Sequence, residues 1–161
     1  MTENKKSPLE NPLYTLIIGV LKGFTTSMWR VSGEGSGGVS RAFGEDLWNL
    51  MNMRAGLIGE EIDKTNPQAA MKSFEKFLTE VYQSADGINY TVRDEMVDMD
   101  VCNCKIHDYT DYLEENDVPR SAGCPYALAA IAMMEDVLGN PYIIDDIKRE
   151  DLNCKISLKG F

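Results

Sequence analysis

Apolar residues recur every three or four positions over three stretches in the first half of the chain, which predicts amphipathic helices. These stretches cover residues 13–31, 39–51 and 71–82. Between the first two lies "SGEGSGGVS", whose glycines predict a flexible connecting loop. Asn66 and Pro67 are typical of a helix cap and a first helical turn, so they predict where the third helix begins.

The second half changes to an alternating pattern in "INYTVRDEMVDMDVCNC", residues 88–104, which predicts β-strands. A shift in parity around "RDEM" indicates a hairpin turn or a bulge. Residues 108–122 are acidic and rich in turn formers. "GCPYALAAIAMMEDVLGN" predicts a fourth helix, with Pro125 in its first turn and Gly139 as its stop, and residues 127–134 are apolar on every face, so it should be buried. Two further strands, "YIIDDIK" and "NCKISLK", close the chain.

This order of elements predicts an α+β fold with an antiparallel sheet of four to five strands, because tight hairpins join antiparallel neighbours. A length of 161 residues fits one domain. We expect residues 1–12 to form a flexible tail and residues 13–161 a single α+β domain. The first helix has a wide apolar stripe and only a glycine-rich connection to the rest, so we expect it to form the interface of a homodimer.

Charge and hydropathy narrow the range of partners. The formal net charge of -10 argues against nucleic acid and anionic membranes. The most apolar segment, "PLYTLIIGVLKGF", is too short to span a bilayer and lacks the features of a secretory signal. We therefore expect a soluble cytoplasmic protein with reduced thiols. The glycine run has neither a following Lys-Ser/Thr pair nor a preceding strand, which argues against a nucleotide cofactor.

The four cysteines are the candidates for chemistry. Cys102 and Cys104 lie two apart on a predicted strand, so we expect both side chains on one face. Cys124 falls in the first turn of the predicted buried helix, where free N–H groups and the helix dipole favour a thiolate. Cys154 begins the last strand. We predict that these four thiolates hold a structural zinc ion in a closed tetrahedral site.

Other interpretations of the same residues stay open. Free cysteines also pack as small hydrophobic residues, and a thiol can carry redox or covalent chemistry. His107, three positions after Cys104, is a substitute fourth ligand. Methionines and a tyrosine are candidates for lining an adaptable apolar pocket, with ordinary core filling as the alternative. These candidates are Met96, Met99, Tyr126, Met133 and Met134.

The segment "GCPYALAAIAMMEDVLGNPYIIDDIKREDLNCKISL" resembles the end of the 4-vinyl-reductase-like domain, through Cys124, Gly139 and Cys154. "MWRVSGEGSGGVSRAFGEDLWNLM" is similar to that family's leading glycine-containing helix. The resemblance implies a four-stranded antiparallel sheet packed with helices, the ligand-binding type of NO-signalling and Golgi-transport proteins, usually dimeric. Its zinc-binding members usually have a Glu and a Cys in the strand before the last cysteine, where this chain has Ile143 and Asp146.

Two classes of function follow from the resemblance. The first is a non-catalytic module that binds a small apolar or aromatic molecule beside a structural metal site. The second is a reductase that acts on a tetrapyrrole vinyl group with electrons from a partner, with Cys124 as nucleophile or proton donor. We expect the binding module, because the chain shows neither a dinucleotide fingerprint nor a convincing acid–base constellation.

Overall fold

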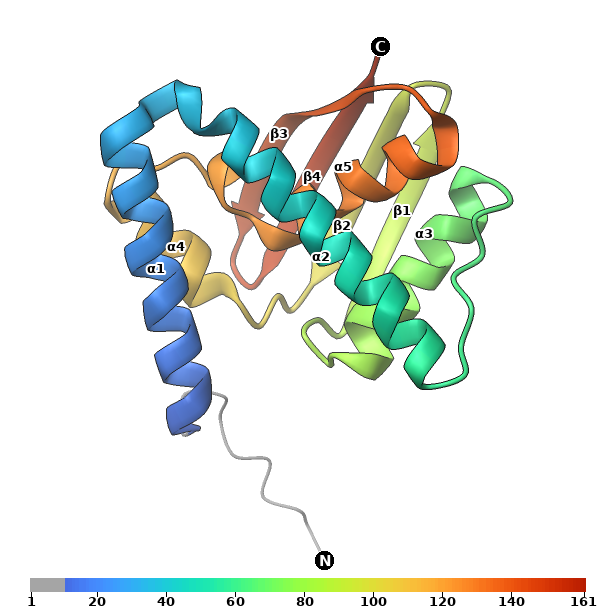
Figure 1. The fold of residues 1–161 in the computed structure, drawn as a ribbon, viewed down its shortest axis with the longest axis horizontal. Helices are drawn as coiled ribbons and strands as arrows, with labels where there is room; N and C mark the ends of the chain where they lie inside the picture. Colours follow the sequence, from blue (N-terminus) through green and yellow to red (C-terminus); the bar gives the residue numbers. More distant parts are fainter. Residues whose placement is uncertain (1–10) are drawn as a thin grey trace, which may run out of the picture.

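The computed structural model describes residues 11–161 and shows an α+β fold, with helices packed on one face of a four-stranded antiparallel sheet (Figure 1). The predicted fold class is therefore confirmed. The tail expected over residues 1–12 lies outside the described residues, except that Asn11 caps the first helix and Pro12 begins it. No helix within residues 11–161 is long and apolar enough to cross a membrane.

The sheet has the strand order β1-β2-β4-β3, and every neighbouring pair is antiparallel. Its strands are β1 (Gly87–Arg93), β2 (Met96–Cys102), β3 (Tyr142–Glu150) and β4 (Asn153–Gly160). Alternate residues face the helices, as Met99 of β2 and its partner Ile156 of β4 show by their burial. Most of the residues between them are polar and face outward, so one face of the sheet belongs to the core and the other to solvent.

The helices begin and end largely where the sequence predicts. They are α1 (Pro12–Ser32), α2 (Gly37–Leu57), α3 (Pro67–Lys76), α4 (His107–Glu115) and α5 (Pro125–Leu138). The side chain of Asn66 accepts a hydrogen bond from the backbone N–H of Ala69, which confirms the predicted cap of α3. Gly139 ends α5 at φ 73°, a left-handed conformation that glycine adopts without strain.

Two local predictions are wrong. The segment "SGEGSGGVS" is not a loop, because Gly33–Ser36 form a 3-10 turn and α2 begins at Gly37. Residues 108–115 of the segment expected to be turn-rich belong to α4, whose buried side chains Tyr109 and Leu113 pack with Ile18 of α1. The apolar face of α4 is short and interrupted by acidic residues, so the sequence gives only a weak helical pattern there. Packing against α1 buries this face.

Helix α5 is the centre of the fold. It lies between α2 and the sheet, and residues 126–134 are all buried (Figure 1). The approach of α2 to α5 is closest at Gly44, where an added Cβ would lie 2.4 Å from the carbonyl oxygen of Leu128. That oxygen belongs to the backbone of α5 and cannot move away by a change of side-chain rotamer. Only glycine therefore fits at position 44.

We predict that Gly44→Ala destabilises the protein by about 1–3 kcal/mol, because the new methyl group separates two packed helices. Gly56→Ala is the matched control in the same helix, since nothing lies within 4 Å of its added Cβ. That control should be neutral or stabilising by about 0.5–1 kcal/mol, through the higher helix propensity of alanine. Urea unfolding of both variants measures the difference, and equal stabilities would contradict the proposed contact.

Candidate functional site

Three of the four cysteines come together at one end of the core, and we call them the thiol cluster: Cys104, Cys124 and Cys154. Each comes from a different element: Cys104 follows β2, Cys124 caps α5 and Cys154 lies near the start of β4. All three are buried and reduced. The thiol of Cys104 is hydrogen-bonded to the sulfur of Cys154. A backbone hydrogen bond from Cys104 N to Leu152 O, 2.8 Å long, holds the two segments together.

Cys102 does not belong to this cluster, so the prediction that it shares a face with Cys104 is wrong. Strand β2 ends at Cys102, which points to the outer face and is partly exposed. Its sulfur accepts a hydrogen bond from the Asn89 amide at 3.7 Å. Asn103 then adopts a left-handed conformation with φ 49°, which breaks the alternation and returns Cys104 to the core side.

The hydrogen bond between Cys104 and Cys154 shifts their pKa values in opposite directions, because Cys104 donates it and Cys154 accepts it. It lowers the pKa of Cys154 to about 7, with further help from the positive charges of Arg149 and Arg120. The same hydrogen bond, followed by burial, raises the pKa of Cys104 far above that of an ordinary thiol. As the pH rises through about 7, the pair therefore gains one negative charge, located on Cys154.

Two arginines flank the thiol cluster on its sheet side. Arg149 lies opposite Cys154 in the β3–β4 register, and Arg120 belongs to the segment before α5. Both reach the carboxylate of Asp111, at 2.7 Å from Arg149 and 3.2 Å from Arg120. The Nε and Nη1 atoms of Arg120 are buried and have no hydrogen-bond partner among residues 11–161. An anionic sulfur nearby offsets the cost of burying this cation.

Cys124 does not form the thiolate predicted from its place at the start of α5. Burial raises its pKa to about 11, although backbone hydrogen bonds from Ala127 and Tyr126 act in the opposite direction. Removal from water thus outweighs the favourable helix terminus. Cys124 is a neutral thiol that fills the space beside the Cys104–Cys154 pair.

His107, the substitute metal ligand, is turned away from the cluster. Its Nδ1 atom lies 2.8 Å from the carbonyl oxygen of Cys104, and its Nε2 atom lies 3.2 Å from the carboxylate of Asp108. Both ring nitrogens are therefore occupied. The histidine fixes the backbone of the Cys104 segment at the start of α4.

The thiols do not fit the tetrahedral four-sulfur site predicted from the sequence. Within residues 11–161, no group of three or more Cys, His, Asp or Glu side chains is placed to hold a metal ion. Cys102 faces the other side of the sheet, and the charge of Arg120 beside the cluster opposes a cation. A zinc or iron site of this kind requires four convergent ligands. The arrangement fits a single stabilised thiolate better than a metal.

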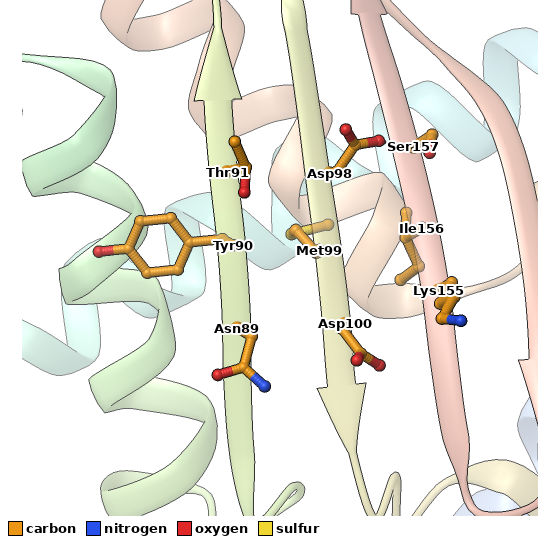
Figure 2. Close-up of a pocket in the computed structure, with 9 residues that line it drawn as sticks. All are labelled: Asn89, Tyr90, Thr91, Asp98, Met99, Asp100, Lys155, Ile156 and Ser157. Atoms are coloured by element: carbon orange, nitrogen blue, oxygen red, sulfur yellow. Dashed lines mark hydrogen bonds between the residues drawn. The ribbon is translucent and has the colours of Figure 1, made fainter.

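Four of the five candidates for an apolar pocket, all except Met96, belong to the hydrophobic core. Met133 and Met134 are fully buried in α5, and the hydroxyl of Tyr126 donates to the carbonyl of Ser84 at 2.8 Å. Met96 is partly buried on the outer side of β2. Met99 lines a hollow of about 330 Å³ over β1, β2 and β4, but polar side chains surround that hollow (Figure 2). They are Asn89, Thr91, Asp98, Asp100, Lys155 and Ser157.

We predict that thiolate absorbance in the ultraviolet rises with a midpoint near pH 7 in Cys102→Ser, which removes the partly exposed thiol from the signal. Adding Cys104→Ala to this background removes the hydrogen bond, so the midpoint should move upward toward the ordinary cysteine value. Cys124→Ala in the same background is the matched control and should leave the midpoint near 7. A midpoint that is unchanged by Cys104→Ala would contradict the paired arrangement.

The comparisons with known proteins correct the resemblance drawn from the sequence. No curated protein matches the chain. A model of a different family matches residues 15–161, nearly the whole chain. The 4-vinyl-reductase-like resemblance rested mainly on the C-terminal segment and three of its residues, and the longer match overturns it.

The description of the matched family is "Putative rubredoxin C-terminal domain". That description connects the chain with rubredoxin, and so with a metal- or redox-related function. The metal implied by the description does not fit the thiol cluster as the structure arranges it. Because the match spans residues 15–161, the chain belongs to this rubredoxin-related family of C-terminal domains.

Proposed function

We propose that this chain is a thiol redox domain in which Cys104 and Cys154 interconvert between a dithiol and a disulfide. The observation that carries the proposal is the hydrogen bond between the two sulfurs, which lowers the pKa of Cys154 to about 7 and so favours its thiolate. A thiolate is the nucleophile of thiol–disulfide exchange, and a neighbouring thiol is the group that resolves the mixed disulfide. The family's connection with rubredoxin supports a role in electron transfer.

The exchange conserves atoms and electrons with an external disulfide as the oxidant. The Cys154 thiolate attacks one sulfur of that disulfide, forms a mixed disulfide and releases one thiolate. Cys104 then loses its proton and attacks Cys154, which forms the internal disulfide and releases the second thiol. Two electrons pass to the external disulfide, and the protein loses the one remaining thiol proton, that of Cys104, to the released thiolate.

The surroundings of the pair control this chemistry. Arg149 and Arg120 stabilise the attacking thiolate, which lowers the pKa of Cys154 without a metal ion. Both sulfurs are buried, so a partner reaches them only when the segments around residues 103–105 and 151–153 open locally. Such gating makes exchange slow with small disulfides and favours a partner that binds this end of the sheet.

The other functions expected from the sequence are not part of the proposal. Reduction of a vinyl group depended on the 4-vinyl-reductase-like resemblance, which the family match replaces. An apolar ligand depended on the same resemblance and on methionines that fill the core. Zinc held by Cys102, Cys104, Cys124 and Cys154 remains a prediction, and metal analysis tests it beside the thiol chemistry.

We predict that oxidation in a glutathione redox buffer forms one disulfide, between Cys104 and Cys154. The midpoint potential should lie between about −270 and −180 mV, the range of dithiols that exchange with cellular carriers. Mass spectrometry of alkylated peptides identifies the linked pair. Cys102→Ser is the control that retains the disulfide, whereas Cys154→Ala should form none.

Two outcomes would contradict the redox proposal. One is that both cysteines remain free, and alkylate fully after unfolding, at the most oxidising potential. The other is that protein purified without added metal carries about one equivalent of zinc or iron per chain, lost in Cys102→Ser. The second result would support the four-cysteine site predicted from the sequence.

A further inference from the structure

Helix α1 carries a second apolar face that no residue between 11 and 161 covers. Its inner face, which includes Ile18 and Leu21, packs against α4. Its outer face exposes large apolar side chains by half to two thirds of their area: Leu13, Leu16, Ile17, Val20 and Phe24. Figure 1 shows α1 at the edge of the molecule, apart from the sheet and α5. We call these five residues the α1 outer face.

We propose that the α1 outer face is the contact between two copies of this chain in a two-fold symmetric dimer. The five side chains together expose roughly 500 Å² of apolar surface, whereas a standard interface buries about 800 Å² per partner, around two thirds of it apolar in homodimers. A patch of roughly 500 Å² lies within the range of the largest apolar patch on a typical monomer, and such a patch often marks an interaction site. The exposed area is therefore what a dimer of this kind needs.

The distribution of charge selects a second copy as the occupant. No acidic or basic residue is exposed on α1 between Leu13 and Ser27, and Lys22 lies over the ring of Tyr112 on α4, 4.9 Å from its centroid. The whole chain carries a net charge of -10, so two copies repel each other except across uncharged surface. An identical uncharged face is the partner of matching chemistry. A helix that lies on a membrane would instead show lysines and arginines beside its apolar face.

The shape of the α1 outer face supports close helix packing. Gly19 and Gly23 lie near the middle of the helix, and among the described residues nothing comes within 4 Å of a Cβ added to either. Each glycine weakens an isolated helix by roughly 0.5–1 kcal/mol relative to alanine, and no contact within the chain requires it. Gly44 shows that α2 and α5 approach through a glycine in this fold. Gly23 borders the α1 outer face beside Leu16 and Val20, so two copies of α1 that cross at Gly23 would approach each other in the same way.

A small hollow beside the α1 outer face could bind a side chain of the second copy. It has a volume of about 50 Å³ between α1 and α2, and apolar residues form most of its wall. Phe24 belongs to both this hollow and the α1 outer face, with Val39 and Phe43 of α2 on the far wall. The apolar surface is thus continuous from one helix to the next, and a buried anchor in such a hollow is typical of the centre of an interface.

Sedimentation equilibrium of the full chain at micromolar concentration tests the proposal. Wild type should be a dimer, and Val20→Lys with Phe24→Lys should raise the dissociation constant at least about 100-fold, because each lysine would be buried against its symmetry mate. Ile143→Lys, on the outer face of the sheet, is the matched control and should remain dimeric. Both lysine substitutions fall on side chains exposed in the monomer, and circular dichroism verifies that the fold is retained.

Gly23→Leu distinguishes close helix–helix packing from non-specific hydrophobic association. Leucine keeps the face apolar and raises helix propensity, but it fills the notch, so the dissociation constant should rise at least tenfold while the monomer stays folded. A wild-type monomer at micromolar concentration would overturn the proposal. So would a dimer that is unaffected by the two lysines, or one that Ile143→Lys disrupts equally.

Discussion

The close contact between α2 and α5 is the constraint on which the rest of the structure depends. Gly44 lets the backbone of α2 approach Leu128, and this presses α5 onto the sheet with residues 126–134 buried. The position of α5 in turn fixes Cys124 at its N-terminus, beside the ends of β2 and β4. The methionines Met133 and Met134 of α5 are part of the hydrophobic core.

The thiol cluster is assembled by the tertiary structure from residues that lie far apart in the sequence. A strand end, a left-handed asparagine and a strand start bring Cys104 and Cys154 into hydrogen-bond contact. The arginines that carry positive charge to this site are themselves held by Asp111 of α4. Helix α4 rests on α1, so the electrostatics of the cluster and the packing of the first helix are linked. An interface on the outer face of α1 would therefore stiffen the support of the redox pair.

Burial and charge act in opposite directions on the three thiols, and their balance differs at each. Cys124 has the favourable helix terminus and the charge of Arg120 nearby, but its burial outweighs both, so its pKa rises. Cys154 is also buried, yet a hydrogen bond and two arginines lower its pKa to about 7. The cysteine with the lowered pKa is thus Cys154, which has a hydrogen-bond donor and two arginines, rather than Cys124 at the helix N-terminus.

Local patterns in the sequence determined the elements whose signals lie within a few residues. The cap at Asn66, the stop at Gly139, the hairpin of β1 and β2 and the buried character of α5 all follow from short-range periodicity and backbone preference. The family was not determined in this way, because three matching residues in one segment are compatible with more than one protein family. Tertiary structure decided the rest. It made α4 a helix by covering its short apolar face with α1, and it separated Cys102 from Cys104 because a single left-handed residue changes which face a side chain reaches. It also set the pKa of each thiol, since desolvation and the distance to an arginine depend on segments far apart in the chain.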